Sequence, residues 1–257
     1  MVALPSPAEF VMGAPTFEYG HNGNEKQHRK KIPRPILMAS KPVTLSQFEK
    51  MYLGYRERFS EKKFGRADDL PAIAVNWFDA AKYCNWLSKL ENIPEEQWCY
   101  QIQGLNFRMK PNYLSLGGYR LPTETEMEFA IRANSTTARF YGDGDALLEK
   151  YAWYLKNSQE MPWPVGSLKP NDFGLFDTLG NCWCWCNDDY RNYPEDDFVF
   201  DDKEISINAH PNINRILRGG GFYFPASYLR SSYRNNTLPT TRNIYAGFRV
   251  VRTVAPQ

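Results

Sequence analysis

The stretch G-N-C-W-C-W-C-N-D-D, residues 180–189, places three cysteines on alternate positions with tryptophans between them. Alternation is the period of a β-strand, so the cysteines are predicted to line one face and the tryptophans the other. The cysteines on the predicted shared face are Cys182, Cys184 and Cys186. Three thiols on one face raise three possibilities to test: a metal site, a redox centre or a catalytic nucleophile.

Strand geometry argues against a zinc site and against a disulfide between these cysteines. Side chains two positions apart on a strand lie about 7 Å from each other, so three of them do not converge on one zinc ion. Neighbouring pairs on a regular strand also do not form an unstrained disulfide. The remaining cysteines, Cys84 and Cys99, lie in apolar segments with no histidine nearby in the sequence, and cysteine catalysis generally needs such a base. The sequence therefore predicts five reduced thiols packed in the core.

Composition excludes several classes of protein. The chain has 257 residues, with 31 Lys and Arg against 29 Asp and Glu, so no basic excess points to nucleic acid. It has no apolar run of 18 residues, and its N-terminus lacks the features of a signal peptide, so we expect no membrane association. Five cysteines without even spacing favour a reducing cytoplasm.

The pattern of elements predicts an α+β fold with little regular secondary structure. Apolar periodicity and capping residues predict helices over 45–52, with Thr44 or Ser46 as N-cap, over 79–90, and over 123–133. The last has Thr123 and Glu126 at capping-box spacing. Most of the remainder is short and strand-like, and the acidic segment 195–214 is predicted to be an irregular surface loop. No repeat of 20–50 residues is present.

Seven segments, in this order and spacing, together resemble one family over nearly the full length. They are F-V-M-G (10–13), P-V-T-L-S-Q-F (42–48), A-V-N-W-F-D-A-A-K-Y-C-N-W-L (74–87), G-Y-R-L-P-T-E-T-E-M-E-F-A-I-R-A (118–133), P-V-G-S-L-K-P-N-D-F-G-L-F-D-T-L-G-N-C-W-C-W-C (164–186), R-I-L-R-G-G-G-F (215–222) and A-G-F-R-V (246–250). The chain resembles the formylglycine-generating-enzyme (sulfatase-modifying factor) superfamily. That resemblance implies one domain over 1–257, which could itself be part of a longer chain.

The resemblance implies a variant of the C-type lectin fold, with a small twisted antiparallel sheet and two main helices. It also implies a structural calcium site beside the G-N-x-W turn, where the family usually has a glutamate and this chain has Cys184. A thiol is a poor calcium ligand. Asp177, with the carbonyls of Gly180 and Cys182, is expected to hold at most a weakened calcium ion, and no other cofactor is expected.

The enzymes of this family carry metal ligands that the chain lacks. Formylglycine-generating enzymes bind copper through a cysteine pair, and alignment on the R-G-G segment places Phe224 and Leu229 at those two positions. The iron-dependent sulfoxide synthases use histidines, whereas His21, His28 and His210 lie at no ligand spacing, and His28 is expected to be exposed. The sequence therefore predicts a protein that is not an enzyme.

The C-terminal segment 215–252 is the predicted ligand-binding segment. It is rich in Tyr, Ser and Asn, which antibody loops use for contact area and adaptable hydrogen bonding. It resembles the variable region of diversity-generating-retroelement proteins, which display varied residues on the same scaffold. The candidate binding residues are Tyr223, Phe224, Ser227, Tyr228, Tyr233, Asn235, Asn236, Asn243 and Tyr245. All of them except Ser227 and Asn243 are expected to share one exposed surface. Beneath them, Arg218, Arg230 and Arg234 are expected to tie loops together through carbonyls and carboxylates.

Three functions remain open from the sequence. The first is a non-catalytic binding module for a protein or small-molecule ligand. The second is a sensor or regulatory domain, fused to or complexed with a bacterial signalling or defence protein. The third is an oxidoreductase of the formylglycine or sulfoxide-synthase type with displaced ligands. An ordinary family member whose C-terminal aromatics simply pack the core is the alternative to the binding surface.

Overall fold

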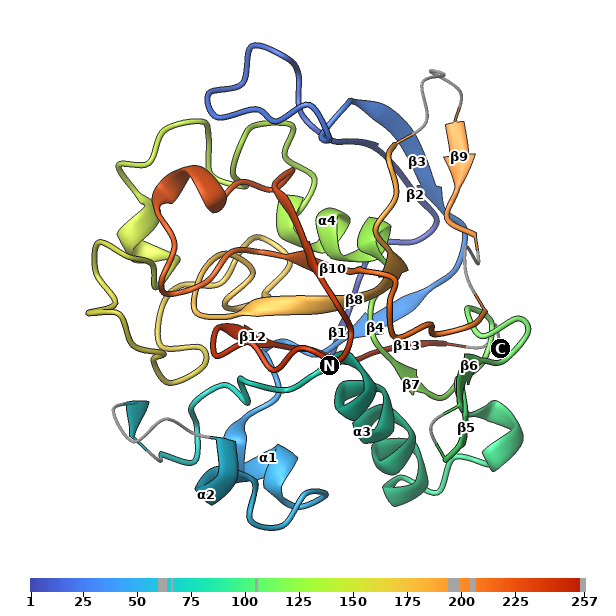
Figure 1. The fold of residues 1–257 in the computed structure, drawn as a ribbon. Helices are drawn as coiled ribbons and strands as arrows, with labels where there is room; N and C mark the ends of the chain where they lie inside the picture. Colours follow the sequence, from blue (N-terminus) through green and yellow to red (C-terminus); the bar gives the residue numbers. More distant parts are fainter. Residues whose placement is uncertain (60–63, 66, 105, 194–198, 204–206, 255–257) are drawn as a thin grey trace.

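The predicted strand of alternating cysteine and tryptophan lies in the middle of the molecule, as β8 (Trp183–Asp189), in a four-stranded sheet (Figure 1). It pairs antiparallel with β10 (Arg215–Arg218) and parallel with β12 (Ala246–Gly247), and β11 (Arg234–Thr237) pairs with the far side of β10. The computed structural model describes residues 1–59, 64–65, 67–104, 106–193, 199–203 and 207–254.

The two faces of β8 pack against different helices, because successive side chains of a strand point to opposite sides. Trp183 and Trp185 belong to the core cluster that also contains residues of α3 (Trp77–Leu90). Cys184 and Cys186 pack in a second cluster, which contains residues of α4 (Glu124–Arg132). All seven residues of β8 are buried. The alternation predicted from the sequence is thus confirmed for Cys184 and Cys186, whereas Cys182 precedes the strand and packs in a separate cluster with Phe222.

Two helices begin after a predicted N-cap, and α3 begins two residues before its predicted start at residue 79. Thr123 caps α4, and its side chain and that of Glu126 form the predicted capping box. Thr44 caps α1 (Leu45–Glu49) in the same way, although this helix ends sooner than predicted. Asn76 caps α3, whereas α2 (Tyr55–Phe59) was not predicted. The described residues also include three short 3-10 turns, η2 (Glu95–Gln97), η3 (Leu148–Lys150) and η4 (Ala226–Tyr228).

The described residues form three further small sheets beside the central one, where the family resemblance implied one small sheet. The first brings the two ends of the described chain together and consists of β1 (Val2–Ala3), β4 (Ile36–Met38), β13 (Val251–Thr253) and β7 (Tyr119–Arg120). The second consists of β2 (Ala8–Met12), β3 (His28–Ile32) and β9 (Val199–Asp201). The third is the hairpin of β5 (Tyr100–Gln103) and β6 (Asn106–Met109).

The acidic segment 195–214 is only partly the irregular loop that we predicted. Residues 199–201 form β9, which pairs in parallel with β3. The strand was missed because its pairing partner lies about 170 residues away in the sequence and leaves no local periodicity. Residues 195–198 and 204–206 of the segment lie outside the described residues. In the described part of the chain, no helix combines the length and apolar character that crossing a bilayer requires.

Candidate functional site

Four aromatic side chains of the predicted binding segment meet in one cluster, which we call the aromatic patch: Phe224, Tyr228, Tyr233 and Tyr245. The ring centroids of Tyr228 and Tyr233 lie 4.5 Å apart in a stacked arrangement, and Phe224 and Tyr245 meet edge to face at 4.9 Å. Phe224 joins the two pairs, with its centroid 5.4 Å from that of Tyr228. Tyr228 lies in η4 and Phe224 shortly before it, while Tyr233 and Tyr245 immediately precede β11 and β12, so only the fold brings the four rings together.

Trp183 of β8 forms the base of the aromatic patch. Its ring centroid lies 5.3 Å from Phe224 and 5.9 Å from Tyr233. The indole is fully buried, and within the described residues its N–H has no hydrogen-bond acceptor. Sequence reasoning placed Trp183 on the opposite face of the strand from the cysteines but did not connect it with the binding segment. No local signal could have done so, because the contact depends on the return of the chain after η4.

The patch is half-buried, which corrects the expectation of an exposed surface. All four rings are of intermediate exposure and pack against the core cluster on the tryptophan face of β8. Stacked rings bury area in each other, so each loses most of one face to its neighbour. Tyr223 is the exception, since 45% of its surface is exposed.

The polar candidates do not all join the aromatic patch. Asn235 pairs with Leu217, which packs in the same core cluster as Trp183. Asn236 pairs with Ile216, which packs in the cluster of α4, so its side chain lies on the other face of the sheet. The one-surface prediction is therefore wrong for Asn236, because consecutive strand residues alternate between faces. Ser227 lies in η4, and Asn243 and Ile244 precede β12; all three are partly exposed.

The three arginines of the segment tie loops together as predicted. Arg218 is fully buried, forms an ion pair with Glu128 of α4, and donates to the carbonyls of Ser231 and Ser232. Arg230 forms ion pairs with Glu18 and Glu25, and Arg234 forms an ion pair with Glu124. Burial by itself would lower the pKa of each arginine. The carboxylates within 4 Å favour the charged form more strongly, so the pKa of each arginine is raised above its ordinary value. These contacts fix the backbone that carries the aromatic patch.

The two positions that correspond to the copper-binding cysteines hold side chains that cannot ligate a metal. Phe224 belongs to the aromatic patch, and Leu229 is fully buried in the cluster of α4. Among the described residues, no group of three or more His, Cys, Asp or Glu side chains comes together as a metal site. Copper chemistry of the family type has no ligands at this place.

The cysteines are buried and unpaired, but two of them are closer than strand geometry predicted. The thiols of Cys182 and Cys184 hydrogen bond, since Cys182 precedes the first residue of β8 and follows Asn181, whose φ is 58°. The hydrogen bond from Cys182 lowers the pKa of the Cys184 thiol to about 7, with help from Arg249 and against the effect of burial. Cys186 remains separate, and burial raises the pKa of its thiol.

The residues of the expected calcium site do not fit a calcium ion. Both carboxylate oxygens of Asp177 already accept hydrogen bonds, one from Gly166 N–H at 2.7 Å and one from Asn181. The carbonyl of Asp177 accepts from Arg249, whose guanidinium thus brings a positive charge to this turn. Burial raises the pKa of the Asp177 carboxyl. Calcium prefers six to eight oxygen ligands, and here one engaged carboxylate stands beside a thiol.

His28 is buried, which corrects the expectation that it is exposed. It lies in β3 with 3% of its surface accessible, and its ring centroid is 4.3 Å from that of Tyr193. Burial lowers the pKa of the imidazole. The charged neighbours in the sequence misled the prediction, because the side chains of a strand alternate and only every second one faces solvent.

Comparison with known proteins identifies relatives of the chain. The family model described as "Sulfatase-modifying factor enzyme 1-like domain" matches residues 3–254. Over 252 residues the chain is 27% identical to "Chaperone protein LppX" of Paenibacillus barcinonensis, covering 84% of this chain and 83% of that protein.

Other relatives are longer than this chain. The formylglycine-generating enzyme of Mycobacterium tuberculosis is 29% identical over 212 residues, which are 73% of this chain but 61% of that enzyme. The serine/threonine-protein kinase pkn1 of Chlamydia caviae is 26% identical over 184 residues, 72% of this chain but 24% of the kinase. Among solved structures, "Treponema denticola variable protein 1" superposes with a TM-score of 0.82 at 24% identity, covering 99% of this chain and 95% of that one.

Proposed function

Because the chain belongs to the family of sulfatase-modifying factor enzyme 1-like domains and has its C-type-lectin-like fold, we propose that it is a binding module without catalytic activity. The aromatic patch, together with the exposed Tyr223 that precedes Phe224 in the chain, is the surface that contacts a protein or small-molecule ligand. The family contains enzymes and also proteins that are not named as enzymes. The fold therefore does not decide the function, and the proposal rests on the site.

One observation carries the proposal: an aromatic side chain stands where a metal-binding enzyme of the family needs a thiolate. Phe224 occupies the first ligand position and connects the stacked pair of Tyr228 and Tyr233 to Tyr245. Tyrosine rings supply large contact area at low entropic cost, and clusters of them are typical hot spots of interfaces. The arginine contacts beneath hold the rings in place, so little order is lost when a ligand binds.

The names of two relatives support binding. LppX is called a chaperone, a protein that acts by binding another protein, and the chain covers 83% of its length. The structural neighbour is called a variable protein, in keeping with the Tyr, Asn and Ser composition of the C-terminal segment. On this basis we further propose that the C-terminal segment displays varied residues to a ligand, as in the variable proteins of diversity-generating retroelements. We place the module in the reducing cytoplasm, because its five cysteines are unpaired.

A regulatory role within a larger assembly is the second candidate. The match to the Chlamydia kinase covers 24% of that protein, so there the related region is one part of a longer chain. In such an assembly the same aromatic patch would contact the signalling partner. The two candidates therefore share the surface and differ in the identity of the ligand.

The enzyme alternative is tested with copper and a substrate peptide. The purified chain is expected to bind no stoichiometric Cu(I) and to leave a Cys-x-Pro-x-Arg peptide unchanged in mass. Tight Cu(I) binding, together with conversion of the peptide cysteine to formylglycine, would overturn the non-catalytic proposal.

The binding surface is tested by capture and identification of a ligand with matched variants. Tyr223→Ala removes an exposed ring next to Phe224 in the chain, and Leu53→Ala removes an apolar side chain that is 84% exposed and lies in another segment. A ligand captured by the wild-type chain should bind the Tyr223 variant at least tenfold more weakly and the Leu53 variant equally well. Equal binding to both variants would place the ligand elsewhere.

A further inference from the structure

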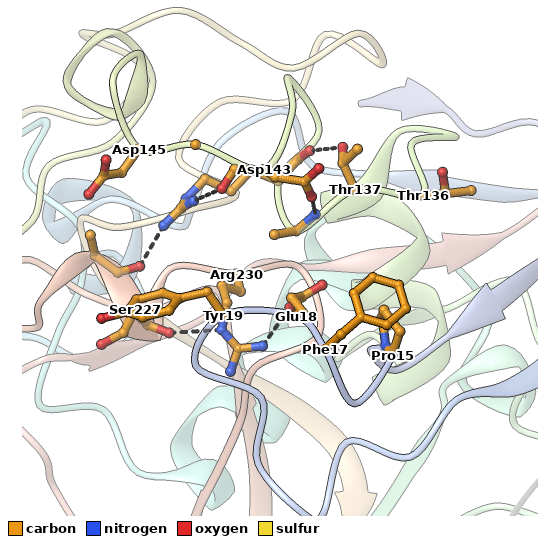
Figure 2. A pocket seen from close by; sticks show the side chains of 14 residues that line it. Pro15, Phe17, Glu18, Tyr19, Thr136, Thr137, Asp143, Asp145, Ser227 and Arg230 are labelled. Atoms are coloured by element: carbon orange, nitrogen blue, oxygen red, sulfur yellow. Dashed lines mark hydrogen bonds and ion pairs between the residues drawn. The ribbon is translucent and has the colours of Figure 1, made fainter.

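A cavity lies beside η4, and Ala226 and Ser227 of that turn are part of its lining. It has a volume of about 670 Å³, within the range of small-ligand pockets. Figure 2 shows its labelled lining, with Phe17, Glu18 and Tyr19 on one side and Thr136 to Asp145 on the other. Ser227 and Arg230 belong to the floor and connect the cavity with the C-terminal segment.

Arg139 is a buried cation in the lining of this cavity without a carboxylate partner. Only 5% of its surface is accessible, and its guanidinium donates to two carbonyls, of Asp143 at 2.8 Å and of Ala226 at 2.9 Å. Its Nε has no hydrogen-bond partner within the described residues, and no described carboxylate lies within ion-pair distance. A buried charge is costly unless it is paired, so this guanidinium is poised to accept a counterion from outside the chain.

The acidic residues of the lining do not fill that role. Glu18 is committed to Arg230, which it contacts at 2.6 Å. Asp143 and Asp145 are exposed, so water solvates their charges, and one carboxylate oxygen of Asp143 accepts the N–H of Ala138. The negative charges of Asp143 and Asp145 weaken the binding of an anion in the cavity and do not neutralise Arg139. Removal of one of these charges should therefore strengthen anion binding.

Two aromatic rings at the rim are unusually open. Phe17 is 89% exposed and Tyr19 is 90% exposed, although both line the cavity. A flat or apolar group placed against them would remove both rings from water, and an aromatic pair contributes beyond the area that it buries. We propose that the cavity is a second ligand site, which binds an oxyanion, carboxylate or phosphate, attached to an aromatic or apolar group.

Benzoate, phenyl phosphate and benzylamine test the site as probes that share a ring and differ in the charged group. Calorimetric titration of the full chain should show benzoate or phenyl phosphate binding at least tenfold more tightly than benzylamine, and the stronger of the two anions identifies the oxyanion class. Tighter binding of benzylamine, or no binding of any probe at millimolar concentration, would overturn the proposal.

Five variants separate this site from damage to the fold. Arg139→Met should weaken anion binding about tenfold or more, as expected for loss of a hydrogen bond to a charged group. Arg108→Met removes the same charge from an exposed position outside the cavity lining and should have no effect. Tyr19→Ala should weaken binding about two- to tenfold without changing the melting temperature.

The most decisive variant is Asp143→Asn, because it predicts a gain. The amide keeps an oxygen for Ala138 N–H but removes a like charge, so anion affinity should rise about twofold to fivefold. A variant with a damaged fold would bind the anion more weakly, not more tightly. A loss of affinity in Asp143→Asn, or unchanged affinity in a folded Arg139 variant, would refute the assignment. Should the Arg139 variant fail to fold, Tyr19→Ala and Asp143→Asn decide the question. Tyr223→Ala should leave probe binding unchanged, which keeps this site distinct from the aromatic patch.

Discussion

Asp188 offers the sharpest test of the electrostatics that hold α4 on the central sheet. It lies in β8, is almost completely buried, and its Oδ2 accepts the N–H of Glu124 at 2.6 Å. Burial raises the pKa of the carboxyl to about 7, with further contributions from Asp202 and Glu124. The hydrogen bond from the N-terminus of α4 acts in the opposite direction but does not offset the burial.

The sign of the effect follows from linkage. Because the folded-state pKa is higher than the unfolded value of 3.8, the fold favours the protonated form. Stability is therefore fully present below the unfolded pKa, is lost as pH rises towards 7, and stays lost above it. One pKa unit corresponds to about 1.4 kcal/mol, so the shift costs about 2 kcal/mol at pH 5.5 and about 4 kcal/mol at pH 8. Both are upper values, because water penetration lowers burial penalties.

Asp188→Asn removes the charge and keeps an oxygen for the N–H of Glu124. The variant should be more stable than wild type by up to about 4 kcal/mol at pH 8, and the gain should be about 2 kcal/mol smaller at pH 5.5. Urea denaturation at both pH values measures the difference, with the exposed Asp172→Asn as the matched control, expected within about 0.5 kcal/mol of wild type. A variant that is less stable than wild type at pH 8, or a difference independent of pH, would refute the reasoning.

The remaining predictions concern the aromatic patch, the cysteines and calcium. Tyr233→Ala should cost about 2 kcal/mol of stability in urea denaturation, because the ring is half-buried and stacked, whereas Tyr223→Ala should cost less than about 0.5 kcal/mol; equal costs would contradict the patch geometry. No cysteine should react with iodoacetamide in the native state, despite the lowered pKa of Cys184, and all five should react after unfolding; rapid native labelling would show that β8 opens. Calcium or a chelator should shift the melting temperature by less than about 1 °C, and a rise of several degrees would mean that Asp177 binds the ion after all.

The local elements could be predicted because their signals lie within a few residues. The capping box of Thr123 and Glu126, and the alternation around Trp183, are contacts or periodicities along the chain itself. The motif spacing identified the family, and with it the absence of the copper ligands at Phe224 and Leu229. For these features, the amino-acid sequence by itself determined the result, because local backbone sterics and face alternation need no distant partner.

Tertiary structure alone decided which side chains meet. Tyr228 and Tyr233 stack on each other above Trp183, and Asn236 turns to the opposite face from Asn235, because of how β10 and β11 pair. The cavity of Arg139 likewise joins a loop near residue 17 to one near residue 143. Such contacts between distant segments depend on burial and strand register, and these are properties of the whole packed chain rather than of any stretch of its sequence.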